Sequence, residues 1–210
     1  MISKVMSLKS GAALLAAVAA GAIDMLPARA GPNRPAHILV SEVTEPPAAW
    51  VEFCMRQPGA CIGPVTASRE VALSQELLTD LRRVNKWVNE TIKPLSDLEH
   101  RGVAEHWSYP DDGYGDCEDY VLLKRRILIQ SGWPSDSLLV TVVRDKNGEG
   151  HAVLMVITDK GDYVLDNQTN DILLWSRTSY HFVKRQSQTD PNVWVALGGP
   201  RTTTATATSR

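Results

Sequence analysis

Apolar residues recur every three or four positions between residues 70 and 93, and this spacing predicts an amphipathic helix. Pro94 ends the run, because proline cannot continue a helix. The recurring apolar positions are Leu73, Leu77, Leu81, Val84, Val88 and Ile92. A stripe of this kind packs against a core far more often than it binds a cofactor, so we expect the helix to be structural.

A second helix is predicted from about Cys117 to Ser131, where Gly132 and Pro134 end it. After it, the pattern changes to short runs rich in apolar and β-branched residues, separated by turn sequences such as KNGEG and KGD. The runs are SLLVTVVRD, HAVLMVITD, DYVLDNQ and DILLWS. Helices followed by consecutive strands predict an α+β fold with the helices packed on one face of an antiparallel sheet.

The two flanks of this region have a different pattern. Residues 34–69 contain five prolines and little periodicity, so we expect an irregular lead-in wrapped on the core. Residues 198–210 are of low complexity, and we expect them to form a disordered tail. The folded domain is therefore expected to cover residues 34–197.

The N-terminus has the three parts of a secretory signal peptide. Lys4 and Lys9 precede an uncharged, alanine-rich run over residues 11–23, which is too short to span a bilayer, and a small-residue cleavage site ends at Ala30. We expect residues 1–30 to be removed and the protein to be periplasmic or secreted, in an oxidising compartment. A short uncleaved anchor or a buried helix is the alternative.

Composition and charge exclude several protein classes. With 43% apolar and 22% charged residues, the chain is neither disordered nor fibrous. Residues 1–30 carry three basic side chains and one acidic side chain, so their removal changes the formal net charge from −2 to −4. A mildly acidic mature protein is a poor candidate for binding nucleic acid, and we expect no nucleic-acid partner.

The chain has three cysteines, and two of them lie close together in the segment WVEFCMRQPGACIG. Pro58 and Gly59 can turn the chain between Cys54 and Cys61. In an oxidising compartment this spacing favours a local disulfide, with two buried thiols as the alternative. The pairing leaves Cys117 as an odd thiol in an exported protein.

Cys117 stands at the start of the second predicted helix, in the segment GDCEDY. The positive end of the helix stabilises a thiolate, and its free N–H groups can bind an oxyanion. A small buried residue is the alternative role for such a cysteine. Asp116 suits the N-cap and Asp119 the capping box, but the acids around the thiol raise its pKa.

A base and an acid follow Cys117 in the predicted strands. His151 begins the run HAVLMV, and Asp166 closes the apolar run YVLD, where a carboxylate needs a partner. Cys117, His151 and Asp166 in this order supply a nucleophile, a general base and an orienting group. If the hairpin turns at residues 160–161, Asp166 lies opposite Met155. It then shares a face with His151 but is about four residues, or roughly 13 Å, away. A bulge, a shifted turn or strong twist would have to close this gap; a locally bonded histidine and an ordinary turn are the alternatives.

These motifs resemble those of the bacterial transglutaminase-like cysteine proteinases, which include LapG-type periplasmic proteases that release biofilm adhesins. The resemblance runs from about Trp50 to Leu197 and rests on FCMRQPGAC, VNKWVN, GDCEDYVLLKRRIL, GHAVLMV and YVLDNQ. It implies a papain-like or transglutaminase-like cysteine proteinase fold. In that fold Cys117 would be the nucleophile, His151 the base and Asp166 its orienting group.

The resemblance also implies calcium binding. Relatives of the LapG type have carboxylates beside the nucleophile as calcium ligands, and the matching residues here are Asp116 and Glu118. Calcium binds oxygen ligands and would offset the charge that opposes a thiolate. Backbone carbonyls, water or Asp97 would have to complete its shell, and helix capping is the alternative role for the two acids. No organic cofactor is implied.

The sequence therefore predicts an exported cysteine endopeptidase with a Cys-His-Asp triad. By resemblance, its substrate would be a large surface adhesin, and an inner-membrane receptor could sequester the enzyme. A transglutaminase or amidase is an alternative, because the same triad can pass an acyl group to an amine. A non-catalytic periplasmic binding module, in which Cys117 is unreactive, is another.

Overall fold

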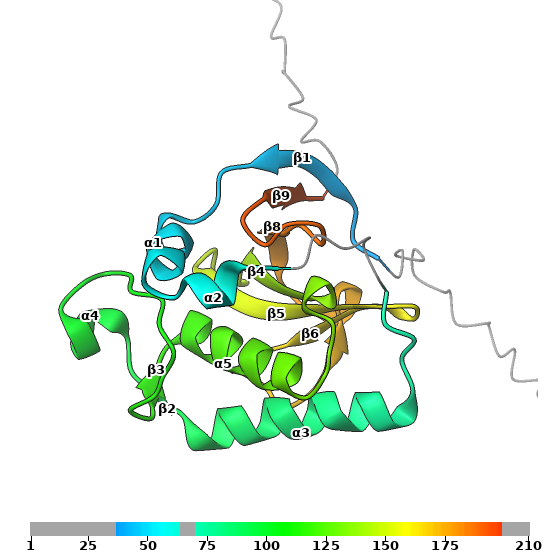
Figure 1. The fold of residues 1–210 in the computed structure, drawn as a ribbon, viewed down its shortest axis with the longest axis horizontal. Coiled ribbons are helices and arrows are strands. Elements are labelled where there is room, and N and C mark those ends of the chain that lie inside the picture. The colour runs from blue at the N-terminus through cyan, green and yellow to red at the C-terminus, as the bar shows by residue number, and fades with distance from the viewer. Residues whose placement is uncertain (1–36, 64–69, 199–210) are drawn as a thin grey trace, which may run out of the picture. The chain divides into compact units, whose positions relative to one another are not determined.

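The computed structural model describes residues 37–63 and 70–198, and these residues form an α+β fold (Figure 1). The predicted signal peptide, residues 1–30, lies outside the described residues. So do residues 199–210, which make up nearly all of the predicted disordered tail. Within the described part of the chain, no helix has both the length and the apolar character needed to cross a membrane.

A seven-stranded sheet forms the centre of the fold, and its strands are antiparallel, as the sequence predicts. Its strand order is β1-β9-β8-β4-β5-β6-β7. The four predicted strands correspond to β4, β5, β6 and a very short β7, whereas β1, β8 and β9 were not predicted. The strands are β1 (Val40–Thr44), β4 (Leu138–Arg144), β5 (Gly150–Thr158), β6 (Gly161–Leu165), β7 (Leu173–Leu174), β8 (His181–Gln186) and β9 (Trp194–Leu197).

The first predicted helix is α3 (Gln75–Thr91), and it begins about five residues later than expected. The hydroxyl of Ser74 caps it by accepting a hydrogen bond from the backbone N–H of Leu77 at 3.2 Å. The preceding Leu73 N–H donates instead to the carboxylate of Asp159, at 2.8 Å. The chain before Ser74 is therefore tied to the β5–β6 turn, and this contact shortens the helix.

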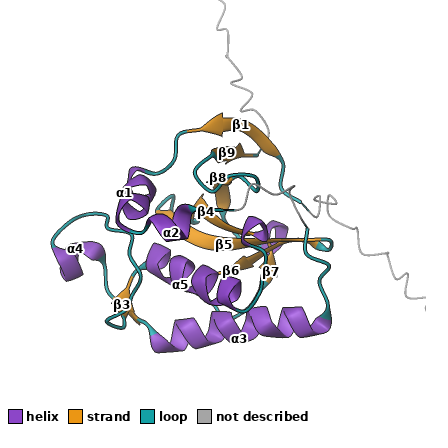
Figure 2. Cartoon of the chain, viewed as in Figure 1, coloured by secondary structure: helices purple, strands orange, loops and turns teal. Residues whose placement is uncertain are grey.

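The second predicted helix is α5 (Cys117–Gln130), which begins at the expected residue. It packs on β5, and α3 packs alongside it on the same side of the sheet (Figure 2). Leu154 of β5 lies in the core on this face, whereas Val153 and Met155 lie in a second core on the other face. Burial on both faces explains why the β5 segment is apolar almost throughout.

The predicted irregular lead-in is wrong for the described part of residues 34–69. It contains β1 and two helices, α1 (Ala48–Arg56) and α2 (Pro58–Cys61). Proline is compatible with the first turn of a helix, where an N–H has no helical partner, and Pro58 begins α2 in this way. A disulfide between Cys54 and Cys61 joins the two helices, with a Cα–Cα distance of 5.6 Å.

Short elements connect α3 to α5 and shape the chain before Cys117. Two parallel strands, β2 and β3, place the segment after α3 beside the segment that leads into α5. The helix α4 follows β2 directly, and its first residue is Asp97. The remaining elements are β2 (Lys93–Pro94), α4 (Asp97–Arg101), β3 (Tyr114–Gly115), η1 (Ser135–Ser137) and η2 (Trp175–Arg177).

Lys124 of α5 is a buried ammonium group inside this fold. Its side chain is fully buried, and its Nζ has no hydrogen-bond partner. The Nζ lies over the ring of Tyr120, 5.8 Å from the ring centroid. Burial lowers the pKa of Lys124 to about 7, and the negative charge of Asp166 acts in the opposite direction. The charged form is therefore disfavoured in the folded state.

We expect Lys124→Met to raise the free energy of unfolding on the order of a few kcal/mol at pH 7. The folded state has a lower lysine pKa than the unfolded state, so the lysine destabilises the fold fully below about pH 7 and progressively less as the pH rises to about 10.5. Urea unfolding at pH 7 and pH 10 should therefore show a gain that shrinks at pH 10. Lys86→Met, at an exposed lysine of α3, should change stability little. A Lys124→Met protein less stable than wild type at pH 7 would contradict this account.

Candidate active site

Cys117 is the first residue of α5, and its side chain is half-buried. Two neighbouring groups shift the pKa of its thiol in opposite directions. The thiol donates a hydrogen bond to Oε2 of Glu118 at 3.0 Å. The backbone N–H of Ala152, the residue after His151, acts to lower the pKa of the thiol and so favours the thiolate. Burial, followed by the Glu118 carboxylate, raises the pKa of Cys117 well above its usual value. In this arrangement the sulfur therefore keeps its proton.

His151 and Asp166 form a buried pair at the start of β5. The two side chains are 5% and 4% exposed, and the imidazole Nε2 lies 2.9 Å from Oδ1 of the carboxylate. A carboxylate can only accept a hydrogen bond, so the proton must be on Nε2. In the neutral ring the lone pair is then on Nδ1, which is the nitrogen that can act as a base.

The β5–β6 hairpin brings His151 and Asp166 together through a register that differs from the predicted one. Thr158 pairs with Gly161, so the turn lies one residue earlier than expected. Continuing this register by one residue places Asp166 opposite Val153, two residues from His151 and on the same face. The separation along the strand falls from about four residues to two, or roughly 7 Å, without a bulge. Gly161 permits the tight turn, because its φ of 114° is a conformation that favours glycine.

Tyr180 and Asn89 hold Asp166 as well, and sequence reasoning missed both. The Tyr180 hydroxyl donates to Oδ2 of Asp166, and the Gln168 N–H donates to Oδ1 at 3.0 Å. Asn89 donates from Nδ2 to the backbone carbonyl of Asp166 at 2.9 Å. Although burial acts to raise it, the hydrogen bonds from His151 and Tyr180 hold the pKa of Asp166 below its usual value. The VNKWVN motif contains Asn89, but nothing in the sequence around Tyr180 signals a role.

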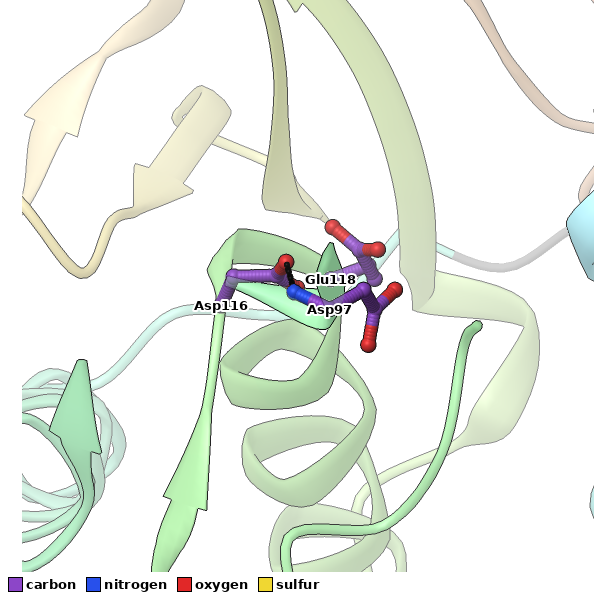
Figure 3. A group of neighbouring side chains, drawn as sticks. All are labelled: Asp97, Asp116 and Glu118. Carbon is purple, nitrogen blue, oxygen red and sulfur yellow. Dashed lines mark hydrogen bonds between the residues drawn. The ribbon is translucent and has the colours of Figure 1, made fainter. Parts of the chain in front are cut away.

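Three carboxylates gather beside Cys117: Asp97, Asp116 and Glu118 (Figure 3). One oxygen from each lies within 4.8 Å of the others, although Asp97 and Glu118 are only 2% and 5% exposed. Burial, followed by the charge of Asp116, raises the pKa of Glu118 to about 9. Burial, followed by the charge of Asp97, raises the pKa of Asp116. The three charges therefore strongly disfavour one another.

The donor set of this carboxylate cluster suits a hard divalent cation. Oδ2 of Asp116 accepts a hydrogen bond from the Asp97 backbone N–H at 3.1 Å, whereas its Oδ1 is buried with no hydrogen-bond partner. Buried carboxylate oxygens without a donor need a counter-charge. Calcium takes six to eight oxygen ligands, so three carboxylates supply part of a shell that carbonyls and water can complete.

The predicted N-cap position of Asp116 is confirmed, but the predicted capping hydrogen bonds of Asp116 and Asp119 are wrong. Asp116 occupies the N-cap position, but its side chain makes no capping hydrogen bond. Asp119 accepts hydrogen bonds from the backbone N–H of Ser108 at 2.7 Å and, more weakly, from its hydroxyl. Burial raises the pKa of Asp119 to about 7, while the Ser108 hydrogen bond acts in the opposite direction. Asp119 therefore ties the loop before α5 to the helix that begins at Cys117.

Trp107, which precedes that loop contact, is a core residue. It is buried among other aromatic rings, with centroid distances of 6.2 Å to Trp50 and 6.5 Å to Trp194. Its backbone carbonyl accepts a hydrogen bond from Arg56 at 2.9 Å, and its indole N–H donates to Glu105 at 3.2 Å. These contacts give the tryptophan a structural role in positioning the loop.

Residues 40–202 match the family model described as bacterial transglutaminase-like cysteine proteinase. Among solved structures, calcium-bound LapG of Legionella pneumophila is 25% identical, with a TM-score of 0.50 over 60% of this chain and 74% of that chain. Two further structures of L. pneumophila LapG, one of them EGTA-treated, are 26% and 25% identical with TM-scores of 0.48. They cover 57% and 60% of this chain and 67% and 69% of theirs. A comparison with curated proteins gave no significant match.

Gly115 is expected to be required for this site to form. A Cβ atom at this position would lie 2.7 Å from the Cβ atom of Asp119, which is closer than real contacts allow. We expect Gly115→Ala to lower the free energy of unfolding by about 1–3 kcal/mol, because the start of α5 must shift. Urea unfolding measures this loss. Gly59→Ala is the matched control, since a Cβ atom there meets nothing within 4 Å. Equal stability of the two variants would contradict the steric argument.

Proposed function

The chain belongs to the bacterial transglutaminase-like cysteine proteinases, and from this premise we propose that Cys117, His151 and Asp166 are its catalytic triad. The observation that supports this assignment best is the buried hydrogen bond of 2.9 Å between His151 and Asp166. It lies at the start of β5, where the backbone N–H of the next residue, Ala152, acts to lower the pKa of Cys117. Thiol peptidases need a nucleophile, a general base and a group that orients the base, and these three residues would supply them.

The proposed reaction begins with proton transfer from the sulfur of Cys117 to Nδ1 of His151. The thiolate attacks the peptide carbonyl carbon, and backbone N–H groups at the start of α5 stabilise the oxyanion that forms. The imidazolium then gives its proton to the leaving amine, and a thioester to Cys117 remains. Water, deprotonated by His151, hydrolyses the thioester and restores the thiol. Asp166 keeps the imidazole in one tautomer and stabilises its charged form.

The hydrogen bond from Cys117 to Glu118 opposes the first step, because the carboxylate stabilises the protonated thiol. We propose that Asp97, Asp116 and Glu118 bind a calcium ion. Their close oxygens and the unpartnered oxygen of Asp116 support this proposal. The similarity to a calcium-bound LapG structure supports it as well. Bound calcium supplies positive charge beside the thiol, which lowers the free energy of the thiolate.

The proposed substrate is a large cell-surface adhesin, cut at a small-residue site near its N-terminus. The motifs shared with LapG-type proteases support this substrate class, and the signal-peptide pattern of residues 1–30 supports a periplasmic or secreted enzyme. An inner-membrane receptor that sequesters the enzyme belongs to the same proposal. Hydrolysis is favoured over transfer to an amine, because the family is one of proteinases.

We expect Cys117→Ala and His151→Ala to reduce cleavage of candidate adhesin fragments by more than roughly a thousandfold. Electrophoresis of fragments after incubation with each purified variant measures the effect. His181→Ala is the matched control, because this exposed histidine begins β8. Retained cleavage by Cys117→Ala would overturn the mechanism. Stable incorporation of a fluorescent amine into a glutamine peptide by the wild type would favour a transglutaminase instead.

We expect the wild type to bind calcium, and Asp116→Asn or Glu118→Gln to weaken binding by about tenfold or more, because each variant loses a charged oxygen ligand. Isothermal titration calorimetry measures the affinity. Asp111→Asn, an exposed acid that pairs with Arg126, should bind calcium like the wild type. Chelation should stop cleavage by the wild type. Cleavage that is indifferent to chelator, or a wild type that binds no calcium, would rule out the calcium proposal alone.

A further inference from the structure

We propose that Tyr180 is a positioning residue for the reaction, acting through the carboxylate of Asp166. The inference rests on the proposed function, since it takes the His151–Asp166 pair to be catalytic. Tyr180 touches both members of this pair. Its hydroxyl donates to Oδ2 of Asp166, and its ring lies 5.4 Å from the imidazole of His151, at an interplanar angle of 45°.

The two oxygens of Asp166 have different partners, and this division fixes the orientation of the carboxylate. Oδ1 accepts from His151 at 2.9 Å and from the Gln168 N–H at 3.0 Å, whereas Oδ2 accepts from Tyr180. If the carboxylate rotated to offer Oδ2 to the imidazole, it would lose the tyrosine hydroxyl. Hydrogen bonds to a charged group are among the stronger ones in proteins, so the contact restrains the side chain effectively.

The pairing of strands in the sheet positions Tyr180 near His151 and Asp166. Tyr180 is the residue before β8, and β8 pairs with β4, which also pairs with β5. Val143 of β4 is paired with His151 on one side and with Phe182 on the other. The tyrosine therefore projects from the end of a strand only two places from the strand of His151. A side chain anchored in this way can hold Asp166 more rigidly than one from a free loop.

A cavity of about 350 Å³ lies beside the hydrogen bond between Tyr180 and Asp166. Both Asp166 and Tyr180 line it, together with polar residues that include Thr169, Asp171 and Arg177. The Tyr180 hydroxyl is hydrogen-bonded to Oδ2 of Asp166, an oxygen that water in the cavity could otherwise contact. Burial, followed by the neighbouring Asp166, raises the pKa of Tyr180, so the hydroxyl stays a donor at neutral pH. Tyr180 thus provides a fixed donor where mobile water would give a variable one.

The test replaces Tyr180 by phenylalanine, which keeps the ring and removes only the hydroxyl. We expect kcat to fall about tenfold with KM within about twofold, because positioning is lost and substrate binding is not. We also expect the pKa of Asp166, followed by the ¹³C resonance of its carboxyl carbon, to rise, because a donor to the charged form is removed. Tyr120→Phe is the matched control. Its buried hydroxyl donates to the Ile92 carbonyl at 2.7 Å, so its loss should change neither kcat nor the pKa of Asp166.

A double-mutant cycle tests whether Tyr180 acts through Asp166. The rate of Cys117 alkylation by iodoacetamide at pH 7 is measured for Tyr180→Phe, for Asp166→Asn and for the double variant. We expect Tyr180→Phe to slow alkylation in the wild-type background and to have no effect in the Asp166→Asn background.

The outcomes separate this inference from the proposed function. If Cys117→Ala is inactive while Tyr180→Phe keeps wild-type kcat and an unchanged Asp166 pKa, the role of Tyr180 is wrong and the triad stands. Equal effects of Tyr180→Phe in both backgrounds of the cycle would also overturn it. If Cys117→Ala remains active, the proposed function fails, whatever Tyr180 does. The carboxyl titration and the alkylation rates do not depend on the identity of the substrate.

Discussion

The pairing of β5 with β4 on one side and β6 on the other is the constraint on which the rest of the structure depends. This strand has His151 as its second residue, is buried on both faces and packs against α5 on one of them. Its pairing with β6 brings Asp166 to the histidine, and its pairing with β4 brings Tyr180 there by way of β8. The helix that packs on it begins with Cys117, whose pKa the backbone N–H of the residue after the histidine acts to lower. A change in the register of this one strand would separate all of these groups.

The surroundings of Asp166 and of Cys117 have opposite effects on the charged forms of these two groups. Asp166 sits among donors that favour its charge, whereas the thiol of Cys117 sits among buried acids that oppose a thiolate. The acids are not incidental, because Asp97 at the start of α4 converges within 4.8 Å on Asp116 and Glu118 at the start of α5. Bringing three carboxylates together in a buried place is unfavourable unless something offsets their charge. The fold therefore provides a thiol whose reactivity is linked to the state of a neighbouring anionic cluster.

Residue types and periodicity were enough to predict the two long helices and four strands, and to select His151 and Asp166, which the structure joins by a hydrogen bond. They were not enough for β1 and β8, which carry polar or charged residues, such as Lys184 and Arg185 in β8. They also missed β9, which has only four residues. The hairpin register depended on one turn residue, Gly161, whose conformation the sequence pattern alone does not fix. The contact between Asp119 and Ser108 and the one between Tyr180 and Asp166 span 11 and 14 residues. Contacts of this kind follow from tertiary packing, so local pattern could not reveal them.

The disulfide between Cys54 and Cys61 has a practical consequence for any measurement on this protein. The chain has three cysteines, all within the described residues, so the oxidised protein offers one thiol to a reagent. Titration with a thiol reagent would then consume one equivalent per chain, at Cys117. Reductants, which are commonly added to keep thiol peptidases active, would open the disulfide and leave three competing thiols. They would also release the link between α1 and α2. The redox conditions of the buffer therefore determine how many free thiols the protein has and whether α1 and α2 are linked.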